Sequence, residues 1–269
     1  MRTRARFQAG PDISETRRAN LRSMSNPTQK IALVTGANRG IGLETARQLG
    51  QRGVTVIAAA RDQVKAQQAA GALQAEGISA VGLKLDVTST ADIQAAARFT
   101  EERFGRLDIL VNNAGIFAEA HFGGNNSTTV TQAELRRTFD TNFFAVIELT
   151  QALLPMLGRS PAGRIVNLSS ILGSLTLHAM PDSPIASARN LAYNSSKTAL
   201  NAFTIHLADA LKGTHIRVNS AHPGWVKTAL GGEAAPMEIV DGAKTSVALA
   251  LAEDAPNGSY SHLGAPLPW

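Results

Sequence analysis

The sequence of 269 residues contains no cysteine, which excludes disulfide bonds, thiol nucleophiles and thiolate metal sites. It also lacks any run of roughly 18 to 20 apolar residues, the length that a membrane-spanning helix requires. We therefore expect a soluble protein with no membrane partner. The first residues lack the apolar segment of a secretory signal, and together these absences favour a cytoplasmic location.

Net positive charge is scarce outside the first residues. The formal net charge at pH 7 is +5, but residues 1–29 carry six arginines against Asp12 and Glu15. The remainder carries 20 basic and 19 acidic side chains and is nearly neutral. Because nucleic-acid binding needs a concentrated basic surface, we expect no nucleic-acid partner. Binding of nucleic acid by the Arg-rich tail alone is the alternative.

Residues 1–29 are predicted to form a disordered leader, because they offer few apolar side chains for packing. Their arginines and serines are typical of a transit peptide, although Asp12 and Glu15 are not. Met24 would provide a natural start shortly before the first predicted strand. We expect one folded domain over residues 30–269.

Short aliphatic runs alternate with longer amphipathic segments along this domain. The runs predict strands at residues 31–35, 54–59, 80–85, 109–112, 164–168 and 216–220. The longer segments predict helices at residues 41–52, 62–76, 89–104, 131–157 and 191–212. The strands lack strict alternation, which is typical of parallel strands buried on both faces. The expected fold is α/β, a single Rossmann-like, doubly wound parallel sheet with helices on both faces.

In such a sheet, ligands bind beyond the carboxyl ends of the strands. Three loops follow strands at that edge, at residues 117–130, 172–189 and 226–238. We interpret them as walls of a substrate pocket; the alternative is that they are surface insertions.

A glycine-rich turn, Thr35-Gly36-Ala37-Asn38-Arg39-Gly40-Ile41-Gly42, links the first strand to the first helix. Gly36 permits a tight exit from the strand, Gly40 lets the backbone approach a pyrophosphate, and Gly42 allows close helix packing. The helix N-terminus adds partial positive charge. The residues expected to contact a dinucleotide here are Gly36, Asn38, Arg39, Gly40, Ile41 and Gly42.

The second strand ends in Ala58-Ala59-Ala60-Arg61-Asp62, where an NAD-selective site usually has a carboxylate. Arg61 and Arg39 could instead bind a 2′-phosphate through charge-assisted hydrogen bonds, which favours NADP(H). Two alternatives remain: Arg61 pairs with a neighbouring acid, or a shifted register brings Asp62 to the ribose.

Polar turns also follow the third and fourth strands. A short polar side chain there can meet an adenine edge or brace a backbone, and each turn alone is only a turn signal. The residues expected to contact the cofactor are Asp86, Val87, Asn113, Ala114 and Gly115.

Only two tyrosines occur in the chain, and Tyr193 precedes Lys197 by four residues. On a helix these side chains share a face, so the ammonium can lie near the phenol. A free tyrosine has a pKa of about 10, and a nearby cation lowers it toward values useful at neutral pH. The pair follows a strand that ends in Ser169-Ser170; without that context, such a pair is typical of a solvated helix face.

In their order, these motifs resemble the short-chain dehydrogenase/reductase family, and the likeness spans essentially all of residues 30–269. The matching motifs are TGANRGIG at 35–42, Asp86, NNAG at 112–115, Asn142, Ser170, YNSSK at 193–197, and Pro223-Gly224 with Thr228. Within the family the sequence is most similar to the carbonyl reductase branch, which is largely NADPH-dependent.

The resemblance implies roles for four catalytic residues. Tyr193 would protonate the carbonyl oxygen as hydride arrives from the nicotinamide, and Lys197 would lower the phenol pKa and bind the nicotinamide ribose. Ser170, rather than Ser169, would steady the substrate oxygen. Asn142 would hold a water that connects Lys197 to solvent.

Further contacts implied by the resemblance follow the sixth strand, at Pro223, Gly224, Val226 and Thr228. Thr228 would meet the carboxamide of the nicotinamide, while Asn113 would adjoin its ribose. Trp225 is interpreted as an apolar wall of the substrate pocket, with core packing as the alternative.

The interval from Ser170 to Tyr193 departs from the family, being longer than in most members and shorter than in typical animal carbonyl reductases. This insertion leaves open whether the protein is a monomer or a homo-oligomer, and whether Leu172, Leu177 and His178 contact substrate. No histidine spacing suits a metal, and we expect none.

The sequence thus predicts an NADPH-dependent oxidoreductase that reduces a ketone or aldehyde to an alcohol, reversibly. The alternative is a non-catalytic dinucleotide-binding or redox-sensing module, which has no need of a tuned phenol. The sequence does not identify the substrate or the direction of the reaction.

Overall fold

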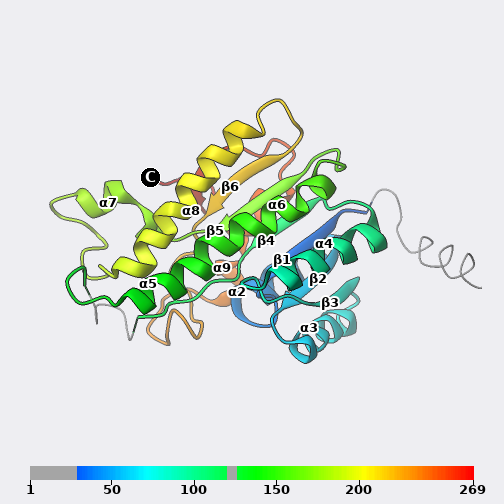
Figure 1. Cartoon of the computed structure of the whole chain (residues 1–269), viewed down its shortest axis with the longest axis horizontal. Coiled ribbons are helices and arrows are strands. Elements are labelled where there is room, and N and C mark those ends of the chain that lie inside the picture. The colour runs from blue at the N-terminus through cyan, green and yellow to red at the C-terminus, as the bar shows by residue number, and fades with distance from the viewer. Residues whose placement is uncertain (1–28, 120–125) are drawn as a thin grey trace, which may run out of the picture.

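The computed structural model describes residues 29–119 and 126–269 (Figure 1). Apart from residue 29, the predicted leader lies outside the described residues, as does the segment 120–125 of the first predicted loop. Within the described ranges, no helix has both the length and the apolar character needed to cross a membrane.

The strands form one sheet in the order β3-β2-β1-β4-β5-β6-β7-β8. All neighbouring pairs are parallel except β7 and β8. The strands are β1 (Ile31–Thr35), β2 (Thr55–Ala60), β3 (Ala80–Lys84), β4 (Ile109–Asn112), β5 (Arg164–Leu168), β6 (Arg217–Ala221), β7 (Ser259–His262) and β8 (Ala265–Pro266). The order reverses between β1 and β4, which is where a doubly wound sheet binds its ligand.

Helices cover both faces of the sheet, which confirms the predicted fold. One face packs against α2 (Gly40–Gly50), α3 (Gln63–Ala75) and α10 (Lys244–Leu251). The other packs against α4 (Thr90–Phe104), α6 (Ala145–Leu157) and α8 (Leu191–Ala210), the helices in front in Figure 1.

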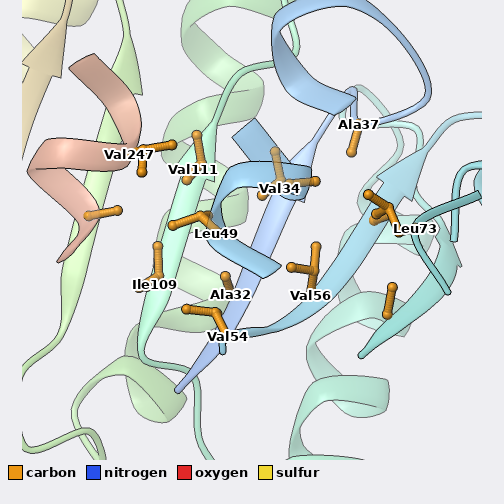
Figure 2. Packing of buried hydrophobic residues seen from close by; sticks show 14 of the residues in the cluster. Ala32, Val34, Ala37, Leu49, Val54, Val56, Leu73, Ile109, Val111 and Val247 are labelled. Carbon is orange, nitrogen blue, oxygen red and sulfur yellow. The ribbon is translucent and has the colours of Figure 1, made fainter. Parts of the chain in front are cut away.

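Strand β1 supplies both cores, because successive side chains point to opposite faces. Ala32 and Val34 face the α2 side, where Figure 2 shows them beside Leu49. Leu33 faces the α6 side and packs with Leu149. Because both faces of β1 are buried, all of its side chains that enter the two cores are aliphatic, and polar residues do not alternate with them.

The predicted helix 131–157 is present without a break from Gln132 to Leu157, but its hydrogen-bond pattern changes in the middle. It consists of α5 (Gln132–Phe139), a π-helical turn (Asp140–Phe144) and α6. Thr131 and Glu134 form a capping box at the start of α5. Asn142 lies in the π-helical turn and is buried. Such turns are frequent at functional sites.

Several short elements were not predicted. The second loop contains a 3₁₀ turn (Ile171–Gly173) and α7 (Leu175–Ala179), and the end of the chain adds α9 (Ile239–Gly242), α10, β7 and β8. Elements of two to eight residues carry too few positions for a periodic pattern, so their sequences read as loops. Tertiary contacts form several of them instead: α10 packs on β5 and β6, α9 packs on α2, and β7 pairs with β6.

Candidate active site

The glycine-rich turn leaves β1 at the carboxyl edge of the sheet, and its geometry requires glycine. Gly36 and Gly40 have φ angles of +64° and +55°, in the left-handed region. A Cβ on Gly42 would stand 2.4 Å from Asn113 Nδ2 and 2.5 Å from the Gly36 oxygen. The turn is therefore packed too closely for any side chain at Gly42.

Asn113 braces this turn from the neighbouring strand. Its Nδ2 donates to the Thr35 carbonyl at 2.7 Å, and the N–H groups of Asn113 and Ala114 both donate to Thr35 Oγ1 at 2.9 Å. Of the two roles left open by the sequence, bracing is the one that this side chain performs. The motif at 112–115 and the glycine turn thus form one rigid corner.

The N-terminus of α2 fits an anionic group. No side chain caps it, and its first turn holds no acidic residue. The partial positive charge of the helix end therefore faces the edge of the sheet uncompensated by this helix. Asp86 lies in the turn that follows β3. Its Oδ1 accepts from Thr88 N and Thr88 Oγ1, which fixes that turn.

The corner expected to select the cofactor carries two exposed arginines. Ala37 N donates to the Ala59 oxygen at 2.9 Å, so the glycine turn and the end of β2 lie side by side. Arg39 and Arg61 each follow two residues later, and neither joins an ion pair among residues 29–119 and 126–269. Both arginine side chains are therefore exposed at this corner, without an acidic partner among the described residues.

Asp62 has a structural role at the same corner. Its Oδ1 accepts from Lys65 N at 2.8 Å and caps α3. The carboxylate that could have reached a ribose is therefore used by the helix.

Tyr193 and Lys197 lie on one face of α8 and are nearly inaccessible, at 8% and 5% exposed. Lys197 Nζ lies 5.6 Å from the centroid of the Tyr193 ring and donates to the Leu168 oxygen at 2.8 Å. A Cβ on Gly115 would stand 3.6 Å from that Nζ. The Lys197 end of the pair therefore lies beside the predicted cofactor loop at Gly115.

The expected low pKa of the phenol is not found. Burial raises the pKa of Tyr193 to about 12, and a hydrogen bond with Ser170 acts in the opposite direction. Burial also lowers the pKa of Lys197 to about 8. The effect of desolvation on the pKa of Tyr193 exceeds that of the Ser170 hydrogen bond, so the phenol is protonated at pH 7.

The structure brings Ser170, and not Ser169, to the phenol. Ser170 caps the 3₁₀ turn, its Oγ accepting from Leu172 N at 3.2 Å. Ser169 donates its backbone N–H to the Ala221 oxygen, and its buried hydroxyl has no hydrogen-bond partner in the described part of the chain.

Asn142 connects the cofactor loop to α8. Its Oδ1 accepts from Ile116 N and its Nδ2 donates to the Ile116 oxygen, both at 2.9 Å. The same Nδ2 donates to Ser196 Oγ at 3.1 Å. The water-holding role implied by the resemblance stays a prediction.

The third loop lies beside the glycine turn. A Cβ on Gly40 would stand 3.6 Å from Thr228 Cγ2, so the two segments face each other. Trp225 is 55% exposed, and its Nε1 donates to the Gly231 oxygen at 2.7 Å. The alternative interpretation of Trp225, packing in the core, is therefore wrong. The next residue, Val226, is buried.

Two residues near the phenol escaped the sequence reasoning. The Phe117 ring lies 5.5 Å from the Tyr193 ring. Glu119, 4% exposed, caps α8 from outside the helix, its two oxygens accepting from Ala192 N and Tyr193 N at 3.1 Å each. Burial raises the pKa of Glu119. A cap more than 70 residues away leaves no local signal, so only the fold could reveal it.

Comparison with known proteins agrees with this geometry. The family profile described as short chain dehydrogenase matches residues 30–239. A short-chain dehydrogenase/reductase of Aspergillus fumigatus is 39% identical, covering 76% of this chain and 81% of that protein. The (+)-neomenthol dehydrogenase of Arabidopsis thaliana is 32% identical, covering 88% and 97%. The crystal structure of NADPH-bound carbonyl reductase from chicken fatty liver superposes with a TM-score of 0.76 at 31% identity, covering 90% and 99%.

The chain therefore belongs to the short-chain dehydrogenase/reductase family. It is an oxidoreductase that acts on carbonyl or alcohol substrates, and members of this family use NAD(H) or NADP(H).

Proposed function

We propose that this protein is an NADPH-dependent reductase that converts a ketone or aldehyde to an alcohol, reversibly. The observation that carries the proposal is the juxtaposition of Tyr193, Ser170 and Lys197 beside Gly115 at the carboxyl edge of the sheet. A neutral buried phenol with a hydroxyl partner is suited to holding and protonating a carbonyl oxygen. A carbonyl reductase among the similar solved structures agrees with this chemistry.

The chemistry that NADPH supplies when bound is donation of a hydride to the carbonyl carbon. Tyr193 and Ser170 hold the carbonyl oxygen through their hydroxyl groups. As negative charge develops on that oxygen, Tyr193 transfers its phenolic proton to it. The Lys197 ammonium then stabilises the phenolate that remains, in a site where burial strengthens the attraction.

The preference for the phosphorylated cofactor rests on Arg39 and Arg61. Both are exposed, they follow adjacent turns, and Asp62 is occupied as a helix cap. Guanidinium groups bind phosphate in a bidentate manner, which a ribose hydroxyl cannot match.

The substrate pocket proposed here is bounded by aromatic side chains. Phe117 packs on the Tyr193 ring, and Trp225 is held over the third loop by its bond to Gly231. Because aromatic walls favour apolar partners, we expect carbonyl compounds with an apolar ring to be better substrates than small polar aldehydes.

The test is NADPH oxidation, followed by loss of absorbance, with a panel of ketones and aldehydes. Tyr193→Phe should abolish turnover for every compound, because it removes the proton donor and little else. NADPH affinity, measured by fluorescence titration, should change by no more than about threefold.

Two outcomes of this test would contradict the proposal. Unchanged turnover of Tyr193→Phe would refute the role of the phenol. Tight NADPH binding with no turnover on any carbonyl compound or alcohol would favour the dinucleotide-binding or redox-sensing alternative.

A further inference from the structure

The backbone of Ser170 is held on both sides by residues from the end of the chain. The Tyr260 hydroxyl donates to the Ser170 oxygen at 2.6 Å, and the next amide, Ile171 N, donates to His222 Nδ1 at 3.1 Å. The Ser170 oxygen also accepts from Gly173 N at 2.8 Å, the bond that closes the 3₁₀ turn. Ser170 has an extended conformation (φ −155°, ψ 147°), and both polar groups of the peptide between Ser170 and Ile171 are engaged. The direction of its hydroxyl toward Tyr193 depends on that conformation.

Tyr260 keeps the proton that it donates to the Ser170 oxygen. It is 2% exposed, and burial together with the nearby Tyr193 raises the pKa of its phenol. The hydroxyl therefore stays protonated across the pH range in which the enzyme would work. Of the two tyrosines in the chain, one is the proposed acid and the other supports that acid's partner.

A second anchor keeps Tyr260 in place. Its ring stacks on the Trp269 ring, with centroids 5.3 Å apart and planes 29° apart. The Trp269 oxygen in turn accepts from Ser174 Oγ at 3.2 Å and from Thr176 N at 2.8 Å. Strand β7 and the last residues thus clamp the segment that runs from Ser170 into α7.

His222 completes the clamp in its neutral form. Burial, and after it the neighbouring His262, lowers the pKa of His222 to about 3. Its Nδ1 is therefore free to accept from Ile171 N, and His262 Nδ1 donates to the His222 oxygen at 2.9 Å. The rings of the two histidines lie 4.9 Å apart.

We propose that Tyr260 is a positioning residue of the reaction, acting through Ser170. Together with the bond from Gly173 N, it fixes the Ser170 carbonyl and so aims the Ser170 hydroxyl at Tyr193 and at the substrate oxygen. The inference rests on the proposed function and adds a residue that lies outside every motif in the sequence. Misplacing a reacting group by about 1 Å can lower the rate about 100-fold, so a single distant hydroxyl can matter.

The test is a double-mutant cycle of Tyr260→Phe and Ser170→Ala. Tyr260→Phe keeps the ring and its stacking on Trp269 and removes only the donor. We expect it to lower kcat by about 10- to 100-fold while NADPH affinity stays unchanged. In the Ser170→Ala background, the same change should lower kcat by less than about twofold, because the residue that it positions is gone.

Thr100→Val is the matched control. Thr100 is fully buried in α4, and its Oγ1 donates to the Ala96 oxygen at 2.8 Å. This variant loses one buried hydroxyl bond far from the site, so its stability should fall while its kcat stays at the wild-type value. The comparison separates positioning from a general loss of stability.

A second variant keeps the test valid if Tyr260→Phe does not fold. Trp269→Leu retains the Tyr260 hydroxyl but removes the ring that aligns it. We expect a smaller loss of kcat, which again disappears in the Ser170→Ala background.

The outcomes separate this inference from the proposed function. Wild-type kcat in Tyr260→Phe, or equal losses with and without Ser170, would overturn the positioning role alone. If Ser170→Ala and Tyr193→Phe both retained full turnover, the proposed function itself would fail.

Discussion

The buried ammonium of Lys197 should lower the free energy of unfolding at neutral pH, compared with a variant that has an uncharged side chain at this position. Lys197 is buried, and its Nζ donates a hydrogen bond to the Leu168 oxygen. Burial lowers the pKa of Lys197 from 10.5 to about 8. Lys197→Met keeps an unbranched apolar side chain in the same space and removes the ammonium. We expect this variant to be inactive and yet more stable than the wild type at pH 7.

The magnitude follows from the pKa of Lys197. A difference between 10.5 in the unfolded chain and about 8 in the folded protein corresponds to roughly 3 kcal/mol. The unfolded chain binds more protons between these values, so wild-type stability rises with pH across this window. Below pH 8 the full penalty is present. Losing the bond to Leu168 costs about 1 kcal/mol at every pH, which leaves a net gain of roughly 2 kcal/mol at pH 7.

The assay is chemical denaturation of both proteins, without cofactor, from pH 7 to pH 10.5. The advantage of Lys197→Met in unfolding free energy should decrease through this range, vanish at about pH 10 and become a small deficit by pH 10.5, because only the lost bond to Leu168 then remains. Burial raises the pKa of Tyr193 to about 12, so its effect begins above pH 10 and is common to both proteins. A stability difference that does not change with pH would refute the reasoning.

Two further predictions concern Arg61 and Glu119. Arg61→Ala should weaken NADPH binding about 10- to 100-fold and NADH binding less than twofold, because it removes a charge-assisted phosphate contact. The exposed Arg98→Ala is the control for loss of charge, and equal losses for both cofactors would contradict the assignment. Glu119→Ala should lower the unfolding free energy by about 1 to 2 kcal/mol and reduce turnover, because the Tyr193 backbone loses its cap. Glu119→Gln retains one acceptor oxygen and should recover part of the lost stability and part of the lost turnover. If denaturation shows that Glu119→Ala is as stable as the wild type, the capping role is excluded.

The fold was predictable because its signals are local. Buried parallel strands such as β1 are aliphatic throughout, and the glycine turn needs residues without a Cβ at Gly36 and Gly42. The short elements at the end of the chain were missed for the opposite reason. Strand β7 has the sequence Ser-Tyr-Ser-His, and only its pairing with β6 makes it a strand.

The candidate site was predictable where spacing implies proximity and unpredictable where it does not. The four-residue spacing of Tyr193 and Lys197 places both on one helix face, and the structure has them there. The sign of the phenol pKa was wrong, because desolvation depends on the whole surroundings of Tyr193 and not on its helix neighbour.

Sequence patterns were enough to predict the first six strands, the long helices between them, the glycine turn and the family motifs. Each of these follows from residues within a few positions of one another. Tertiary structure alone decided that Glu119 caps α8 and that Tyr260 holds Ser170, across 73 and 90 residues respectively. A hydrogen bond between distant segments is set by how the chain returns to the sheet, and no local pattern records that path.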